Sequence, residues 1–183
     1  MVLKPQDLLV ALKATLLPAG GRFRFAAVAA DLGLSRSEVH AAVSRAVQAK
    51  LLMRVPLANV DGAAPIRRNI LEFVLHGASY AFPPDLGGVT RGLPTGYAAP
   101  VLSAFFAPAS SLPPVWPDPN GSVRGRAFEP LYRSAPGAAA KDERLYALLA
   151  LTDAIRGGGA REREIAARLL TASIAPGGTG DEP

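Results

Sequence analysis

Apolar side chains recur at helical spacing in four stretches of the chain, residues 3–17, 25–52, 142–155 and 161–170. Within each stretch they fall three or four residues apart, which places them on one face of a helix. Arginine and phenylalanine alternate over residues 22–25, which predicts a short strand with both aromatic rings on one side. The pattern therefore predicts a mainly α-helical protein with a small β component.

The second of these stretches predicts two helices joined by a tight corner. Ala29 is small enough for the helices to cross there, and Gly33 can adopt the left-handed conformation that such a corner needs. Ser35 and Glu38 have the spacing of a capping box, which starts the second helix at Arg36. These features in this order are typical of a helix-turn-helix, although an ordinary packed pair of helices could show each of them.

The outward face of the second helix of this pair, together with the basic residues around it, supplies the candidate functional side chains. Arginine and glutamine can bind guanine and adenine edges, serine and lysine can bind phosphates, and a small alanine lets a helix enter a groove. The candidate DNA-binding residues are Arg24, Ser35, Arg36, Ser37, His40, Ala41, Ser44, Arg45, Gln48, Lys50, Arg67 and Arg68.

Residues 1–60 resemble winged helix-turn-helix transcriptional regulators of the MarR-like kind. The resemblance covers about a third of the chain and implies the winged-helix fold and a DNA-binding regulator, usually a homodimer on a two-fold site. The long amino-terminal dimerisation helix of that family has no counterpart here, because the first predicted helix begins almost at Met1. The residues that carry the resemblance are Ala29, Gly33, Leu34, Ser35, Val39 and the AKLLMR of residues 49–54.

The wing of such a fold is expected between residues 53 and 68. Asp61-Gly62 is a typical hairpin turn, whereas Pro56 and Pro65 each remove a backbone donor and predict a short or irregular hairpin. Arg67-Arg68 either meets the minor groove or the phosphate backbone from the wing, or forms an exposed basic pair before the next helix.

A short buried helix is expected over residues 70–76. Asn69 and Glu72 have capping spacing at its start, and Gly77 is expected to end it in a left-handed conformation.

Residues 79–136 are rich in proline and glycine but also in aromatic side chains. Because disordered segments are poor in aromatics, we expect an ordered, loop-rich layer over the helical core, with a hairpin turn at residues 119–121 and a strand over 122–128. Arg91, Arg124 and Arg126 each stand beside a glycine on what we expect to be loops. There they could bind phosphates, or be ordinary solvated or ion-paired side chains.

Three parts of the chain are expected. Residues 1–77 form a winged helix-turn-helix DNA-binding domain, residues 78–173 a loop-rich and helical extension that could dimerise, and residues 174–183 a flexible tail. The helical pair of the extension either packs back on the domain or against a two-fold mate.

The formal net charge of +5 is concentrated at the start of the chain. Residues 1–54 hold eight Lys or Arg and three Asp or Glu, residues 55–140 hold six and five, and residues 141–183 hold six and seven. Such a local excess favours a phosphate backbone as the partner, although an arginine-rich composition alone could produce it.

The composition also indicates in which cellular compartment the protein is expected. Cysteine is absent, which excludes a disulfide framework and thiolate metal sites and fits a reducing cytoplasm. No apolar run approaches the roughly 20 residues that a membrane span needs, and no targeting signal is evident. We expect a soluble cytoplasmic protein with no membrane partner.

No catalytic pattern is evident in the sequence. There are two histidines, His40 in the helix pair and His76 at a helix end, and no phosphate loop, nucleophile elbow or dinucleotide fingerprint. We therefore expect no enzymatic activity, no cofactor and no metal.

The first functional hypothesis is a DNA-binding transcriptional regulator, with repression as the expected mode. It binds double-stranded DNA as a homodimer and reads the major groove with the helix over residues 36–50. The alternative is a protein-interaction or antitoxin-like adaptor module on a winged-helix scaffold. An effector, either a small molecule or a protein, is left open.

Overall fold

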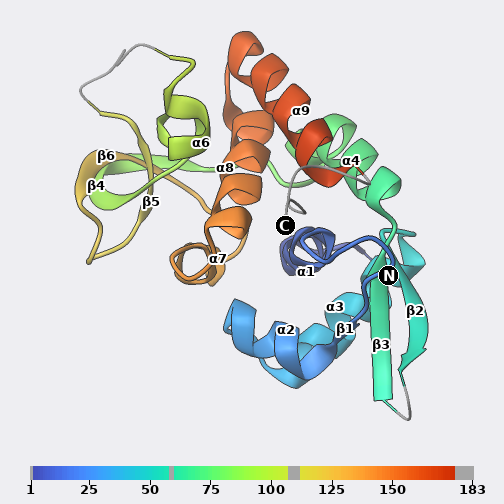
Figure 1. Ribbon diagram of the computed structural model, residues 1–183. Helices are drawn as coiled ribbons and strands as arrows, with labels where there is room; N and C mark the ends of the chain where they lie inside the picture. The colour runs from blue at the N-terminus through green and yellow to red at the C-terminus, as the bar shows by residue number, and fades with distance from the viewer. Residues whose placement is uncertain (1, 58–59, 107–111, 176–183) are drawn as a thin grey trace, which may run out of the picture.

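The computed structural model of the protein describes residues 2–57, 60–106 and 112–175. Helices predominate, and the strands form two small sheets, so the fold is mixed α and β (Figure 1). Within these residues, no helix combines the length and the apolar character needed to cross a membrane.

The first half of the chain places a pair of helices and a small sheet beneath helix α1 in the view of Figure 1. The strand order is β1-β3-β2, and both pairings are antiparallel. The elements are α1 (Pro5–Thr15), β1 (Phe23–Arg24), α2 (Phe25–Leu32), α3 (Arg36–Gln48), β2 (Leu52–Leu57), β3 (Val60–Pro65), α4 (Arg67–His76) and α5 (Ala78–Ala81).

The tight corner between α2 and α3 forms as the sequence predicts. Gly33 follows α2 with φ +63°, a left-handed conformation that costs glycine little. The hydroxyl of Ser35 accepts from the Glu38 backbone N–H at 3.1 Å, and the Ser35 backbone N–H donates to Glu38 Oε2 at 2.8 Å. Both N–H groups would otherwise lack partners at the helix start, so the capping box fixes Arg36 as the first residue of α3.

The hairpin of β2 and β3 differs from its expectation in two respects. The predicted turn at Asp61-Gly62 is wrong, because both residues lie in β3 and Gly62 pairs with Val55. Pairing runs without interruption from Leu52 with Pro65 to Leu57 with Val60, so the connection falls on residues 58–59, outside the described residues. The expected irregularity is also absent from these strands. Pro56 lies on the edge strand β2, and Pro65 is the last residue of β3, beyond its pairing with β1, so both prolines stand where they are tolerated.

Helix α4 begins earlier than predicted. Its first residue is Arg67, and the side chain of Asn69 donates to the Lys50 carbonyl at 2.8 Å. The expected capping role of Asn69 is therefore wrong. Gly77 has φ −119°, so the predicted left-handed stop is wrong as well. Only Ile70 and Val74 of this helix are fully buried, so the helix lies on the surface of the core rather than inside it.

The second half of the chain contains a sheet that closes on itself. Strand β4 pairs antiparallel with β5 and with β6, while β5 and β6 pair parallel to each other. A turn at residues 119–120 and a strand after it are present, but the predicted hairpin is wrong, because β5 and β6 pair parallel to each other. Strands β4 and β5 lie in segments that the sequence predicts to be loops. The elements are β4 (Leu86–Pro94), the single-turn 3₁₀ helix η1 (Gly96–Ala98), α6 (Pro100–Ser103), β5 (Pro114–Pro117), β6 (Val123–Phe128), α7 (Ala135–Ala139), α8 (Glu143–Gly157) and α9 (Ala160–Ile174).

A buried carboxylate fastens the closed sheet to α8. Asp153 accepts hydrogen bonds from Thr95 Oγ1 at 2.9 Å and from Trp116 Nε1 at 2.6 Å. Its second oxygen accepts from Arg156 Nη1 at 2.6 Å, and Arg156 also donates to the Phe82 carbonyl. Because an unpaired buried charge is costly, these contacts hold the sheet and the helix in one arrangement.

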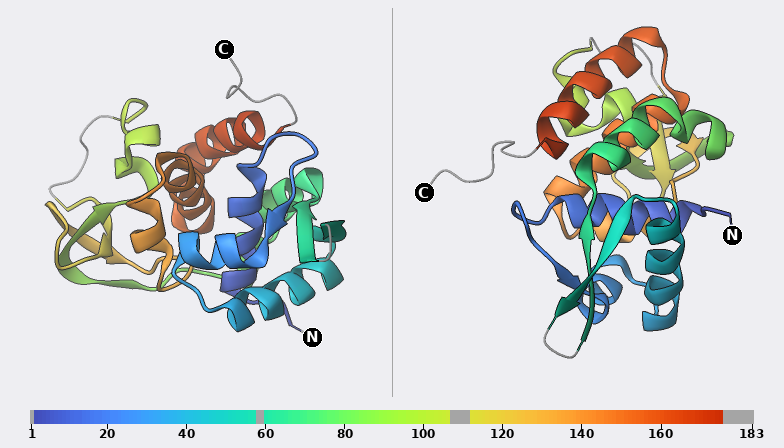
Figure 2. Two further views of the ribbon diagram at one scale, coloured as in Figure 1. Left: turned by 60° about the horizontal axis from the view of Figure 1, so that its bottom comes forward. Right: turned by 90° about the vertical axis from the view of Figure 1, so that its right-hand side faces the viewer.

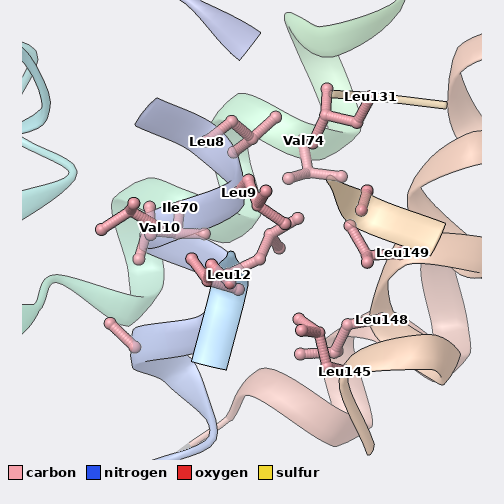
Figure 3. Close-up of a cluster of buried hydrophobic side chains, with 14 of the residues drawn as sticks. Leu8, Leu9, Val10, Leu12, Ile70, Val74, Leu131, Leu145, Leu148 and Leu149 are labelled. Atoms are coloured by element: carbon pink, nitrogen blue, oxygen red, sulfur yellow. The ribbon is translucent and has the colours of Figure 1, made fainter. Parts of the chain in front are cut away.

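The hydrophobic core joins both halves of the chain. Figure 3 shows Leu9 and Leu12 of α1 facing Leu148 and Leu149 of α8, all fully buried. Burying such a side chain contributes roughly 1.5–3 kcal/mol. Helices α8 and α9 therefore pack back on the domain, and the core crosses the boundary expected after residue 77.

Helix α9 ends later than the sequence predicts, so the tail begins later as well. Helix α9 extends to Ile174, which is buried, so a tail from residue 174 is wrong at its first position. Residues 176–183 lie outside the described residues.

Candidate nucleic-acid interface

One face of α3 remains open to solvent. The opposite face carries Val39, Ala42, Val43 and Ala46, which are buried against α1 and α2. On the open side Arg36, Ser37, His40 and Gln48 are exposed, while Ala41 and Ser44 are half-buried. The structure thus brings together most of the side chains that the sequence assigned to this face.

The centre of the open face is held by contacts to neighbouring elements. The ring of His40 lies edge-on to Phe25, with centroids 5.9 Å apart. Ser44 Oγ donates to the His40 carbonyl and accepts from Arg54 Nη2, each at 2.9 Å. Arg54 belongs to β2, and its place beside α3 could not be inferred from its position in the sequence.

The amino-terminal end of α3 has its polar groups arranged by the capping box. The hydroxyls of Ser35 and Ser37 lie 3.1 Å apart. Hydrogen bonding from the Ser35 backbone N–H lowers the pKa of Glu38, so this carboxylate is ionised at neutral pH. Arg36 is exposed beside this cluster.

Arg45 is not on the open face. Its Nε donates to Asp7 Oδ2 at 2.7 Å and its Nη2 to Asp7 Oδ1 at 2.6 Å, and the Asp7 side chain is fully buried. The expectation that Arg45 reads a base edge is therefore wrong. The periodicity of α3 allowed either orientation, and a buried carboxylate on α1 turns the guanidinium inward.

The Arg67 side chain also points inward and bonds backbone carbonyls. It donates to the carbonyls of Thr15 and Leu17 at the end of α1, and its Nη1 lies 3.4 Å from the Ile174 carbonyl at the end of α9. These helix-end carbonyls lack partners within their own helices, so Arg67 satisfies them. The expected wing or exposed-pair role of Arg67 is wrong, while Arg68 is exposed on α4.

Arg24 and Lys50 flank α3 on the surface. Arg24 is exposed in β1, immediately before α2. Lys50 is exposed after α3, with φ +59°, in a left-handed turn that the Asn69 side chain stabilises through its carbonyl. Together with Arg36 and Arg54, they give the face around α3 four exposed cationic side chains.

The second half of the chain also reaches the helix corner. Tyr132 Oη lies 3.3 Å from Glu38 Oε1, and Arg133 Nη2 lies 3.6 Å from the same oxygen. Ser134 packs beside Gly33. No local pattern in the sequence predicts this contact, because the two segments lie almost a hundred residues apart.

Three comparisons with known proteins complete the description of the site. No family model, no curated protein and no solved structure matches the chain. Among the described residues, no group of three or more His, Asp or Glu is placed to hold a metal ion.

Proposed function

We propose that the protein is a DNA-binding transcriptional regulator with a winged helix-turn-helix domain, and that it acts as a repressor. The observation that carries the proposal is the open face of α3, where Arg36, His40 and Gln48 are exposed beyond a glycine corner. Within the described residues these three side chains have no hydrogen-bond or ion-pair partner. A helix presented in this way can enter the major groove, which accommodates an α-helix.

The order of elements around this face supports the winged form of the motif. A short strand precedes α2, and an antiparallel hairpin follows α3 directly. Figure 1 shows the hairpin of β2 and β3 on the same lower side of the molecule as α2 and α3. In this proposal the hairpin is the wing and contacts the backbone or the minor groove next to the helix.

The charges of the first half favour phosphates as the partner. Of its basic residues, Lys13 is paired with Asp31 and Asp142, and Arg45 with Asp7. The remaining exposed cations include Arg24, Arg36, Lys50 and Arg54, all close to α3 in the chain. Each phosphate contact contributes a slope of about −0.9 to the logarithmic dependence of affinity on salt.

A protein-interaction or adaptor function is the second candidate. Its support is Tyr80, whose side chain is 86% exposed next to a hollow lined by Leu75, His76 and Ala167. Exposed aromatic rings are typical of protein interfaces. A two-fold operator requires a homodimer of the DNA-binding regulator, which the half-site spacing of a selected motif would reveal.

A selection from random DNA duplexes tests the proposed function. The purified chain should enrich a motif with two half-sites whose centres are about 10–10.5 base pairs, or a multiple of this, apart. Its affinity should fall steeply as salt rises. Indifference to every duplex at low ionic strength would contradict DNA binding and leave the adaptor function.

Point variants separate base reading from phosphate binding. Arg36→Ala and His40→Ala should each change the enriched motif, because they remove groups that can face base edges. Lys50→Ala should weaken binding to all duplexes alike. Arg163→Ala, an exposed arginine on α9, is the matched control and should change neither property.

A further inference from the structure

Three exposed arginines lie together on the outer surface of the closed sheet. Arg91 on β4 is directly opposite Arg124 on β6, and Arg126 follows two residues later on the same strand. Directly opposite residues of an antiparallel pair share a face, as do residues two apart on one strand. The three guanidinium groups and Val89, opposite Arg126, therefore form one arginine face.

The inner surface of the same strands accounts for the glycines beside these arginines. A Cβ at Gly92 would lie 2.0 Å from the Trp116 carbonyl oxygen, and one at Gly125 would lie 2.0 Å from that of Pro113. Only glycine allows the backbones to approach so closely. Closure of the sheet thus requires glycine on the inside, but it places no demand for arginine on the outside.

The arginine face is unfavourable for the isolated protein. Like charges directly opposite each other on neighbouring strands destabilise a sheet by a few tenths of a kcal/mol to about 1 kcal/mol. Within the part of the chain that the structure describes, none of the three guanidinium groups has a hydrogen-bond or ion-pair partner. Three arginines at outward positions, where any polar residue would serve, indicate a partner that carries several negative charges.

We propose that the arginine face binds the phosphodiester backbone of DNA outside the segment read by α3. This inference rests on the proposed DNA-binding function and extends it to a second, sequence-independent contact. Guanidinium groups bind phosphate through two parallel hydrogen bonds. An acidic protein partner is less well matched, because interface centres are aromatic and apolar, whereas three of the four side chains in the Arg91–Arg124 and Val89–Arg126 pairs are arginine.

The closed sheet lies away from the α2–α3 corner, so its arginine face could contact only DNA that extends beyond the segment bound by α3. Figure 1 shows the closed sheet at the upper left of the molecule and the β2–β3 hairpin at the lower right, with α2 on the side of α3 that is nearer the sheet. The closed sheet and the hairpin also lie apart in the left view of Figure 2. A duplex held only at α3 and the hairpin would not need the sheet. A longer duplex that extends past α2 would bring further phosphates toward it.

The test compares two lengths of duplex and two triple variants. One duplex is the selected operator of about two helical turns, and the other has roughly two further turns on each side. The first variant combines Arg91→Gln, Arg124→Gln and Arg126→Gln. The charge-matched control combines Arg161→Gln, Arg163→Gln and Arg168→Gln, all exposed on α9.

The sheet variant should bind the short duplex like wild type and the long duplex more weakly. For the long duplex, its logarithmic salt slope should be smaller by about 2.7, which corresponds to three lost phosphate contacts at about 0.9 each. The control should match wild type on both. An unchanged circular dichroism spectrum and unchanged Trp116 fluorescence would show that the sheet variant is folded.

The outcomes separate the two proposals. Equal affinity of wild type and the sheet variant for the long duplex would overturn the arginine face as a DNA contact while leaving α3 as the reader. Loss of binding to a polyglutamate probe with DNA affinity unchanged would also overturn it, in favour of an acidic protein. A wild-type chain that binds neither duplex would defeat the proposed function itself.

Discussion

Arg45 of α3 holds the fully buried carboxylate of Asp7 on α1 through two hydrogen bonds, at 2.7 and 2.6 Å. The same carboxylate accepts from the Lys4 backbone N–H at 2.8 Å and so caps α1. These hydrogen bonds raise the pKa of Arg45 further above its usual range. The ion pair acts together with the buried apolar stripe of α3 to hold the helix in the orientation that leaves Arg36, His40 and Gln48 facing solvent.

Arg45→Ala should lower the free energy of unfolding by about 3–5 kcal/mol, because it leaves a buried carboxylate without its counter-charge. Urea unfolding followed by circular dichroism measures the change. Arg36→Ala, on the open face of the same helix, is the control and should stay within about 0.5 kcal/mol of wild type. Equal stabilities of the two variants would contradict the structural role of the pair.

The glycines of the closed sheet should differ sharply in their tolerance of a methyl group. Gly92→Ala and Gly125→Ala each place a Cβ 2.0 Å from a backbone oxygen that no side-chain rotation can move. We expect each to cost about 3 kcal/mol or more, at or beyond the upper end of ordinary overpacking. Gly88→Ala, on the same strand as Gly92 with no described atom within 4 Å of the new methyl, should cost less than about 0.5 kcal/mol. Thermal unfolding of the three variants measures the difference.

Asp153→Ala should loosen the attachment of the closed sheet to α8. The change removes the acceptor for Trp116 Nε1 and Thr95 Oγ1 and the counter-charge of Arg156, at a cost of about 3–5 kcal/mol. Trp116 is the single tryptophan of the chain, so its fluorescence reports on this contact. In the variant, unfolding seen by fluorescence should begin at a lower urea concentration than unfolding seen by circular dichroism. Coincident transitions would argue against it, and Glu143→Ala, exposed on α8, serves as the control.

Tyr146 should ionise at unusually high pH. Burial raises its pKa to about 12, and its hydroxyl donates to the Pro94 carbonyl at 2.5 Å. Because the folded pKa lies above the unfolded value of 10.0, the stabilisation is complete below pH 10 and is lost as the pH rises toward 12. Phenolate absorbance should show a late step that Tyr146→Phe removes. Tyr80→Phe, at an exposed ring, should leave that step in place.

The elements that sequence alone could predict are those set by neighbours along the chain. Gly33 needs a left-handed corner, and Ser35 with Glu38 closes a capping box, so both signals lie within a few residues of the feature they specify. The open face of α3 follows from the same local periodicity. These expectations are confirmed, whereas the local signals for a turn at Asp61-Gly62 and for a left-handed Gly77 are wrong.

The failures at Arg45, Arg67 and the closed sheet have a different cause. Arg45 and Arg67 look like surface residues in the sequence, but their partners lie 38 and more residues away, at Asp7 and at the ends of α1 and α9. Six of the thirteen residues in strands β4 and β5 are glycine or proline and only three are β-branched, so local propensity argued against them. They are held by pairing across the closed sheet, which no short window of sequence contains.

Because the two halves share one core, the first half of the chain cannot be separated from the second without exposing apolar side chains. Leu9 and Leu12 of α1 are covered by α8, so a fragment that stops at residue 77 would carry an uncovered apolar stripe into water. A gene fusion that borrowed only the helix pair and its hairpin would therefore yield an aggregation-prone product. The two halves therefore depend on each other for folding. A change in how α8 packs on α1 would also alter the support that α1 gives to α3.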